Sequence, residues 1–350
     1  MYFGSDNSAG AAPQILDALL KANEGNAPSY GADEYCTRAT AKLAAVFEHE
    51  VDVFYVTTGT AANALALAAL TPPYGAILSH QEGHINVDEC GAPEFFTHGA
   101  KIIPVAGEGA KITVAALEQM LSGLPKHEPH NCPLKVLSLT QATECGLLYT
   151  PQEISALTSL AKAHDLQVHM DGARFANAVV RLGCAPADIT WRAGVDVLCL
   201  GATKDGALGV EAIIFFKREL AHDFRYRIKR AGQLVSKARW LGAQMEAWLQ
   251  DDLWLTLART ANDRADELAQ ALMDIPGVRI VWKPEANSIF AILSAEVHAR
   301  LQAAGAVYYE WPRFSLPAGI TLRTDDVFVR FVTSFRTTSA NIEALLHASR

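Results

Sequence analysis

The sequence predicts an α/β protein with a mainly parallel sheet in a large domain, followed by a smaller α+β domain at the C-terminal end. Short apolar runs alternate with helix-like stretches from residue 51 to about residue 216. Half of the 350 residues are hydrophobic, enough for one large core and a smaller second one. Beyond Pro276 the alternation gives way to an α+β pattern.

The alternating region contains the strands expected in the large sheet. Val51–Val56 is predicted as a strand and Ala61–Leu70 as the helix after it. The other predicted strands are Ala76–Ser79, Lys101–Val105, Val136–Thr140, Gln167–Met170, Val195–Leu200 and Ala212–Phe216, with helices at Val114–Leu121 and Pro151–His164. The Pro- and His-rich stretch 123–133 is predicted to be a surface loop, with His127 and His130 in solvent.

The last third of the chain starts with a helical pattern from Leu234 to Met273. Trp240, Trp248 and Trp254 lie in it, and we interpret them as packing residues between domains. Strands are predicted at Val278–Trp282, Ser288–Leu293 and Val327–Thr333, and helices at Ala295–Ala304 and from Ser339. The chain is therefore divided into an N-terminal arm (1–14), a large domain (15–240), and a linker helix with a small α+β domain (241–350).

Composition limits the possible partners and compartments. Thirty basic and 38 acidic residues give a formal net charge of −8, which argues against nucleic acid or an anionic membrane as main partner. No apolar run reaches transmembrane length, and the first residues do not resemble a signal peptide. The six cysteines lack metal-type spacing, and Cys199 is predicted to be a buried free thiol. We expect a cytoplasmic protein without a metal site.

Two charged residues follow predicted buried strands. Asp171 precedes Gly172 at the end of one strand, and Lys204 follows the strand that ends at Leu200. Carboxyl ends of neighbouring strands are the usual ligand sites of open α/β sheets. An amine that forms a Schiff base and a carboxylate that keeps a ring nitrogen protonated suit an aldehyde cofactor with a basic ring. The alternatives are that Asp171 caps a helix and pairs with Arg174, and that Lys204 is a solvated loop residue.

A possible anion site lies at the start of the first predicted helix. The segment TTGTAAN, residues 57–63, follows the first strand and leads into an Ala/Leu helix. Small residues at a helix start expose backbone N–H groups, and the helix dipole adds positive potential. Gly59 and Thr60 would be the donors. Helices also begin with Gly-Thr simply for capping, so this feature gains weight only together with Asp171 and Lys204.

These motifs together resemble the L-threonine aldolases. The resemblance is carried by VHMDGARFANA (168–178), the strand followed by Thr203-Lys204, the GTAAN helix start and GHINVDECGAPE (83–94). That family consists of pyridoxal-phosphate (PLP) enzymes of the aspartate-aminotransferase fold, fold type I, in the group that also holds the β-eliminating lyases. The resemblance extends from Phe3-Gly4-Ser5-Asp6 to Val329-Arg330-Phe331-Val332-Thr333.

The resemblance implies a PLP site in the large domain. Lys204 would form the Schiff base with the cofactor, and Asp171 would pair with the pyridine nitrogen. His84 would stack on the ring face, while Gly59 and Thr60 would bind the phosphate.

The resemblance also implies how an amino-acid substrate binds. Ser5, Arg174 and Arg330 would hold its carboxylate, because a guanidinium fork matches a carboxylate, and Arg174 would also touch the cofactor. Asp88 is a further candidate for substrate binding. Tyr30, also a candidate, matches a segment that in the family reaches a neighbouring subunit's site. A homo-oligomer with its site near a subunit interface is therefore implied, with a tetramer favoured over a dimer.

Two positions depart from the family pattern. Many members have Thr-His-Asn-Gly where this chain has Thr143-Glu144-Cys145-Gly146, so a histidine discussed for β-hydroxyl recognition is absent. Lys229 stands where the family often has an arginine that reaches the phosphate. The general base is therefore open between His84 and a water held by Asp88 or Glu144, and His84 could equally serve only for stacking.

The expected activity is PLP-dependent cleavage of L-threonine, L-allo-threonine and related β-hydroxy-α-amino acids, such as phenylserine, to glycine and an aldehyde. The nearest alternative is a PLP-dependent β-eliminating lyase. A serine hydroxymethyltransferase is disfavoured because no folate site can be named. The intact set of Lys204, Asp171, Arg174 and Arg330 argues against a binding protein without turnover. A dinucleotide-dependent dehydrogenase is set aside because no GxGxxG follows the first strand.

Overall fold

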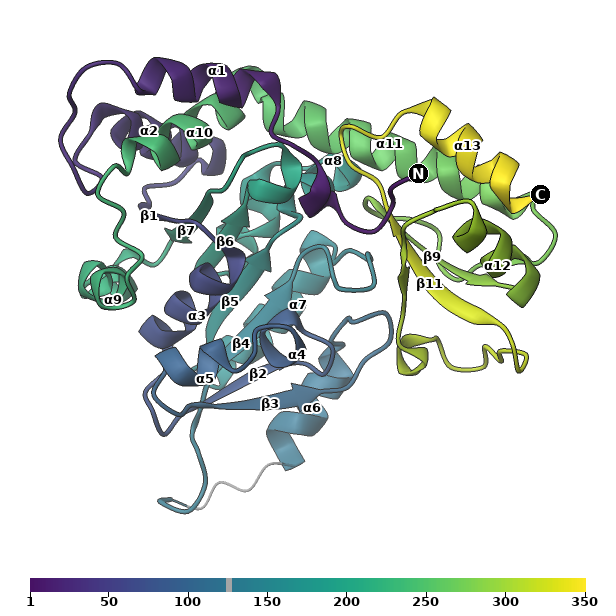
Figure 1. Ribbon diagram of the computed structural model, residues 1–350. Helices are drawn as coiled ribbons and strands as arrows, with labels where there is room; N and C mark the ends of the chain where they lie inside the picture. Colours follow the sequence, from purple (N-terminus) through teal and green to yellow (C-terminus); the bar gives the residue numbers. More distant parts are fainter. Residues whose placement is uncertain (124–127) are drawn as a thin grey trace.

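The computed structural model describes residues 1–123 and 128–350 and contains a seven-stranded sheet of order β1-β7-β6-β5-β4-β2-β3 (Figure 1). β7 is antiparallel to both neighbours, and the other adjacent pairs are parallel. The expected mainly parallel sheet is thus confirmed. Its strands are β1 (Asp52–Val56), β2 (Ala76–His80), β3 (Lys101–Val105), β4 (Leu134–Thr140), β5 (Gln167–Gly172), β6 (Val197–Gly201) and β7 (Glu211–Phe215).

Helices cover both faces of this sheet. The two N-terminal helices, α1 and α2, were not predicted from the sequence. The α-helices of this part are α1 (Pro13–Ala22), α2 (Glu34–Phe47), α3 (Gly59–Leu70), α4 (His84–Val87), α5 (Ala92–Phe96), α6 (Val114–Gly123), α7 (Pro151–Ala163), α8 (Phe175–Leu182), α9 (Phe224–Arg230) and α10 (Arg239–Leu249).

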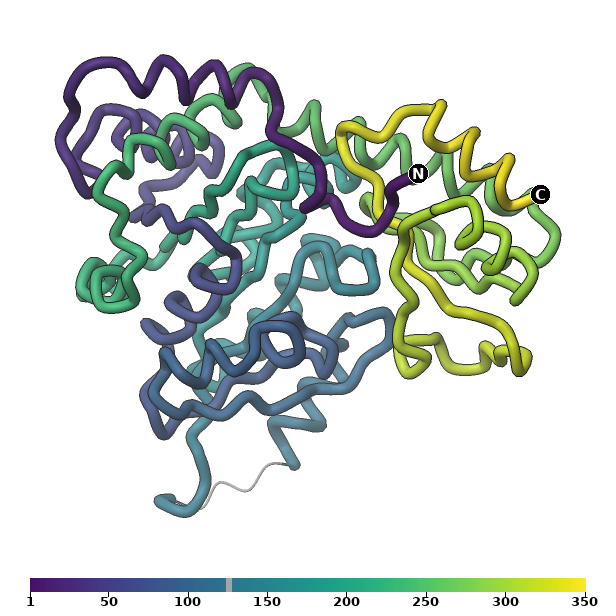
Figure 2. The backbone as a smooth tube through the Cα atoms, in the orientation of Figure 1, coloured from purple at the N-terminus to yellow at the C-terminus, as the bar shows by residue number. Residues whose placement is uncertain are grey.

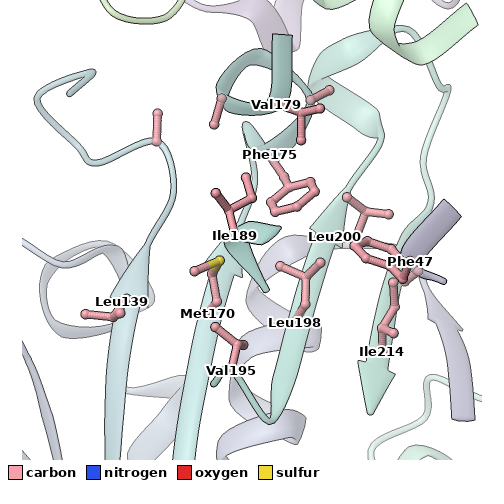
Figure 3. Packing of buried hydrophobic residues seen from close by; sticks show 14 of the residues in the cluster. Phe47, Leu139, Met170, Phe175, Val179, Ile189, Val195, Leu198, Leu200 and Ile214 are labelled. Atoms are coloured by element: carbon pink, nitrogen blue, oxygen red, sulfur yellow. The ribbon is translucent and has the colours of Figure 1, made fainter. Parts of the chain in front are cut away.

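Alternation along β5 decides which side chains face the core and which face α3. Val168 and Met170 belong to the main hydrophobic cluster, which also contains Phe175 (Figure 3). The intervening His169 and Asp171 point to the opposite face, because successive side chains of a strand alternate. That face is covered by α3, whose Ala/Leu sequence is buried along almost its full length.

The small domain packs an antiparallel sheet of order β10-β11-β9-β8 against helices, which confirms the expected α+β region. Its first strand is two residues shorter than predicted, and β10 was not predicted. The elements are α11 (Leu253–Met273), β8 (Val278–Ile280), β9 (Ser288–Leu293), α12 (Ala295–Ala303), β10 (Tyr309–Glu310), β11 (Val327–Val332) and α13 (Ser339–Ser349).

The tryptophans near the junction of the two parts differ in their environment. Trp248 and Trp254 are buried, with ring centroids 5.4 Å apart, as expected for packing residues. Trp240 is 44% exposed, so its interpretation as a packing residue was wrong.

The N-terminal residues are attached to the small domain. Phe3 donates its N–H to Val307 O at 2.7 Å and accepts from the N–H of Val332 at 2.8 Å. Both termini lie beside the small domain in Figure 1, and Figure 2 shows the N-terminal segment passing from there towards α1. Ser5 and Asp6 are therefore held where the two domains meet.

Three further expectations can be compared with the structure. Cys199 is buried and unpaired, as predicted. His130 is exposed, as expected, whereas His127 lies outside the described residues. Within the described part of the chain, helices long and apolar enough to cross a membrane are absent.

Candidate active site

Lys204 lies in a tight turn directly after β6. The short helix η4 (Thr203–Asp205) is held by a hydrogen bond from the N–H of Asp205 to Ala202 O at 3.1 Å. The indole Nε1 of Trp248 donates to Asp205 O at 2.8 Å. Burial and the positive charge of Arg174 lower the pKa of Lys204. The turn therefore fixes an amine that loses its proton more readily than an ordinary lysine.

Asp171 is placed on β5, the parallel neighbour of β6, and is only 5% exposed. Its Oδ1 accepts from the N–H of Ala173 at 2.9 Å, and its Oδ2 accepts from Asn63 Nδ2 at 2.8 Å. Burial favours the neutral acid, but the charges of His84 and Lys204 and these hydrogen bonds hold the pKa of Asp171 below its ordinary value. A buried carboxylate thus stays ionised at neutral pH.

His84 begins α4 and is joined to Asp171 through two side chains. Its Nδ1 lies 2.8 Å from Glu89 Oε1. Asn63 Nδ2 donates to both Glu89 Oε1 and Asp171 Oδ2, each at 2.8 Å. The hydrogen bond to Glu89 raises the pKa of His84 against the opposing effect of burial. These four side chains form one hydrogen-bonded network on the face of the sheet covered by α3.

The first turn of α3 is open to an anion. Thr58 caps the helix, its side-chain oxygen accepting from the N–H of Ala61 at 3.1 Å. The N–H groups of Gly59 and Thr60 come earlier and have no acceptor within the helix. A Cβ placed on Gly59 would meet no atom within 4 Å, so the space beside this turn is free of protein.

Arg174 stands at the start of α8 and is paired with a carboxylate from the N-terminal arm. Its Nε and Nη2 donate to the two oxygens of Asp6 at 2.8 and 2.9 Å. Asn287 Nδ2, from the small domain, donates to Asp6 Oδ2 at 2.9 Å. Burial is outweighed by the charge of Arg174, so the pKa of Asp6 is lowered. Ser5, the neighbour of Asp6, caps the short helix η1 (Asp6–Ser8).

Arg330 extends from β11 towards the same region. Its guanidinium carbon lies 4.3 Å from the ring centroid of Trp311 and 5.9 Å from that of Tyr309. Its Nε is buried and has no hydrogen-bond partner among the described residues. Burial and the charge of Arg174 lower the pKa of Arg330 to about 10, so the side chain remains cationic at neutral pH. Asp88 is exposed and contributes a nearby negative charge.

Glu144 stands beside His84, at the position where the family pattern often has a histidine. Its Oε1 accepts from the backbone N–H of His84 at 2.8 Å and from Thr140 Oγ1 at 2.9 Å. Its Oε2 is buried without a partner in the described chain. Burial raises the pKa of Glu144 to about 7. This carboxyl group therefore changes its charge near neutral pH.

Tyr30 and Lys229 meet each other at a different place. Lys229 Nζ lies 5.2 Å from the ring centroid of Tyr30, and the N–H of Tyr30 donates to Ser236 O at 3.0 Å. Both side chains are exposed, and Tyr30 lines a cavity of about 300 Å³ between α2, β1 and α9. The contacts among residues 1–123 and 128–350 join neither of them to Lys204 or Asp171.

Sequence reasoning gave no role to four residues of this site, namely Asn63, Glu89, Asp6 and Asn287. Asn63 is the only amide in the Ala/Leu segment of α3, and such a lone polar residue signals a buried partner. Asp6 adjoins Ser5 within the motif that carried the resemblance. Glu89 lies in the GHINVDECGAPE segment (83–94), five residues after its partner His84. Asn287 offered no comparable signal, because its partners Asp6 and Thr333 are distant in the chain.

His169 belongs to the same motif as Asp171 but lies one layer deeper in the sheet. Its ring nitrogens lie 2.9 Å from Ser138 Oγ and 3.3 Å from Cys199 Sγ. Burial lowers the pKa of His169 to about 4, so the ring is neutral at physiological pH. It supports the strand behind Asp171.

Known proteins are similar to this chain along most of its length. A family model described as β-eliminating lyase matches residues 3–296. The chain is 45% identical over 307 residues to the low specificity L-threonine aldolase of Pseudomonas aeruginosa, and 43% identical over 307 residues to that of Pseudomonas sp. strain NCIMB 10558. Each alignment covers 88% of both proteins. The solved threonine aldolase of Leishmania major matches with a TM-score of 0.91 and 29% identity, over 99% of this chain and 98% of that one. The chain thus belongs to the β-eliminating lyase family and groups there with the low specificity L-threonine aldolases.

Proposed function

We propose that this protein cleaves L-threonine, L-allo-threonine and related β-hydroxy-α-amino acids, such as phenylserine, to glycine and an aldehyde, with PLP as cofactor. The observation that carries the proposal is the arrangement of Lys204 and Asp171 on adjacent strand ends beside two arginines. Arg174 and Asp171 both act electrostatically on Lys204, and Arg174 also acts on Arg330, so the four groups share one site.

The described side chains fit PLP. The readily deprotonated amine of Lys204 would hold the cofactor covalently, and the ionised carboxylate of Asp171 would hold its ring nitrogen. Gly59 and Thr60 would bind the phosphate at the open first turn of α3, and His84 would lie against the ring. When bound, PLP withdraws electrons from the α-carbon of an amino acid and so weakens the bonds to that carbon.

The arginines supply the part of the site that selects which bond breaks. Asp6 occupies Nε and Nη2 of Arg174, whereas the buried Nε of Arg330 has no partner in the described structure. The guanidinium of Arg330 therefore has more nitrogen atoms available to a substrate carboxylate than that of Arg174, and Arg174 and Ser5 lie beside it. A carboxylate held in this way fixes the rotation about the bond between the α-carbon and the amine nitrogen. It thereby decides which of the other bonds to the α-carbon is aligned for cleavage.

The proton of the β-hydroxyl group must pass to a protein group or a water. Glu144 has a pKa of about 7, which suits a general base at neutral pH. Asp88 is the exposed alternative, and either carboxylate could act through a water. His84 is the third candidate.

The test is a product assay on threonine, allo-threonine and the phenylserine diastereomers, with aldehyde and glycine measured together. Equimolar aldehyde and glycine are expected, and they should vanish in the Lys204→Ala variant. If no β-hydroxy amino acid yields glycine, the proposal is wrong.

A β-eliminating activity is the second candidate, because the matching family model carries that description. It would use the same Lys204 and Asp171 but would release a keto acid and ammonia from a substrate with a β leaving group. Keto acid and ammonia in place of aldehyde and glycine would favour this alternative.

The quaternary structure and location belong to the same proposal. Tyr30 and Lys229 lie together on the surface, away from Lys204, and would contribute to the site of a neighbouring subunit, Tyr30 near its substrate and Lys229 near its phosphate. We therefore propose a homo-oligomer, with a tetramer favoured over a dimer, working in the cytoplasm. The divisions at residues 14/15 and 240/241 stay predictions. Light scattering of the purified protein tests the oligomer directly.

A further inference from the structure

We infer that Trp311 is a positioning residue that holds the guanidinium plane of Arg330 by stacking, so that the N–H groups of Arg330 stay free and the site selects ligands with a free carboxylate. Arg330 receives the substrate carboxylate in the proposed function, on which this inference rests. Its starting point is the distance of 4.3 Å between the guanidinium carbon of Arg330 and the ring centroid of Trp311.

The small sheet brings the two side chains together. Arg330 on β11 is paired with Tyr309 on β10, and the N–H of Trp311 donates to Phe328 O at 2.7 Å. Residues that face each other across an antiparallel pair lie on the same side of the sheet, and so do residues two positions apart in a strand. These side chains therefore share one face of the sheet, and Phe290, the partner of Arg330 on β9, belongs to that face as well.

That face is otherwise apolar, so aromatic rings are the main neighbours of Arg330. Phe290, Ile292 and Phe328 form its buried cluster, and the ring centroid of Trp311 lies 5.5 Å from that of Phe290. The second ring beside the guanidinium group is Tyr309, at 5.9 Å. The buried Nε of Arg330 has no hydrogen-bond partner in the described part of the chain. Stacking is thus the contact that fixes this side chain.

Stacking of this kind holds an arginine without using its donors. A cation is attracted to the face of an aromatic ring within about 6 Å of the centroid, and tryptophan attracts it most strongly. The guanidinium group is flat and its N–H bonds lie in its plane, so a ring that covers its face leaves those bonds unoccupied. An ion pair would instead occupy them, as Asp6 does at Arg174. Trp311 therefore orients Arg330 and leaves its donors to a ligand.

A guanidinium group held in one plane favours a ligand with two acceptors in that plane. A carboxylate offers this arrangement and can accept two parallel hydrogen bonds. A carboxamide offers one acceptor and turns an NH₂ group towards the arginine. The class of ligand selected is therefore the α-amino acid with a free carboxylate. Without the ring, Arg330 would keep its charge but lose its orientation, so the preference for a carboxylate should shrink.

The test compares the binding of glycine and glycinamide to the PLP-loaded protein by isothermal titration calorimetry. Both ligands carry the amine, and only glycine carries the carboxylate. Trp311→Leu keeps an apolar side chain without a ring face, and we expect it to raise the Kd of glycine about tenfold and that of glycinamide less than about twofold. A ratio of the two Kd values that is the same in wild type and Trp311→Leu would overturn the inference. A wild type that binds both ligands equally well would overturn it too.

Matched variants separate this effect from a disturbance of the fold. Trp282→Leu removes another indole from the same aromatic cluster, where the ring of Trp282 packs against Phe290 and Phe328. It should leave the Kd of glycine unchanged, whereas Trp311→Phe keeps a ring face and should retain most of the glycine affinity. Equal losses in Trp282→Leu and Trp311→Leu would contradict the inference, because they would indicate a general effect of the cluster.

A double variant shows whether Trp311 acts through Arg330. Lysine keeps the charge but has no plane to orient, so in the Arg330→Lys background the added loss from Trp311→Leu should largely disappear. Losses that simply add would show that Trp311 reaches the ligand by another route, and the positioning role would be wrong.

The outcome is independent of the aldolase assay. Glycine binding that weakens selectively in Trp311→Leu, together with a wild type that releases no aldehyde from any β-hydroxy amino acid, would overturn the proposed function and support the inference. Aldehyde release by the wild type with an unchanged Kd of glycine in Trp311→Leu would do the reverse.

Discussion

The substitution Asp6→Asn tests the junction between the N-terminal arm and both domains. Asp6 accepts two hydrogen bonds from Arg174 and one from Asn287, at 2.8 to 2.9 Å. An asparagine has nearly the same shape but lacks the charge, and its NH₂ group would face the donors of Arg174. The variant therefore leaves a buried guanidinium without its counter-charge.

The expected loss in the free energy of unfolding follows from the burial of this ion pair. The side chains of Asp6 and Arg174 are only 1% and 15% exposed, so water cannot replace the lost partner. Removing one member of a buried ion pair costs about 3–5 kcal/mol. Because the folded pKa of Asp6 is lowered, the stabilisation is present above about pH 4, the ordinary aspartate value, and is lost as pH falls further.

The assay is urea unfolding of the cofactor-free protein at pH 7 and at low pH, with Asp17→Asn on the exposed face of α1 as control. The control is expected to change the unfolding free energy by less than about 0.5 kcal/mol. A loss below about 1 kcal/mol for Asp6→Asn at pH 7 would refute the reasoning, because it would show that the Arg174 charge is compensated elsewhere.

Four further substitutions test other parts of the site. Lys204→Ala should lose covalently bound PLP, measured by absorbance after gel filtration; retained absorbance would contradict its assigned role. Arg330→Lys keeps the charge but not the fork, and should raise KM about tenfold or more with a smaller change in kcat. Trp248→Phe removes the donor to Asp205 O and should lower the unfolding free energy by about 1–2 kcal/mol in a urea titration. The folded pKa of Glu144, about 7, exceeds its ordinary 4.5, so its neutral form stabilises the fold below pH 4.5 and this benefit is lost as pH rises through 7. Glu144→Gln should therefore flatten the pH dependence of unfolding over that range by up to about 3 kcal/mol, and an unchanged slope would contradict the burial of this carboxyl group.

Several elements of the fold and site could be predicted because their signals are local. The strand that ends at Asp171 and the turn that holds Lys204 are each visible in a few consecutive residues. Helices α1 and α2 were missed, although α2 buries Phe47 and Leu43 in the main core. Their apolar positions are separated by polar and small residues, so only packing against α10 makes their pattern clear.

Roles within the site were harder to predict than its main residues. Tyr30 was expected to reach a neighbouring subunit's site and Lys229 to approach the phosphate, and within one chain these two side chains meet each other away from Lys204. The alternative that Asp171 pairs with Arg174 gives way to a pair between Arg174 and Asp6, a contact between residues 168 positions apart in the chain. A carboxylate this distant carries no sign of its partner in the sequence.

The sequence by itself determined that an acid and a lysine would end neighbouring strands of a parallel sheet, because strand periodicity and the turn residues after each strand are local properties. Only the tertiary structure decided the electrostatics of the pair. Asp171 stays ionised because the charges of His84 and Lys204 and the amide of Asn63 favour its charged form, and Lys204 loses its proton more readily because burial and Arg174 disfavour its cation. Burial and charge at such short range depend on contacts between distant segments, and these exist only in the folded chain.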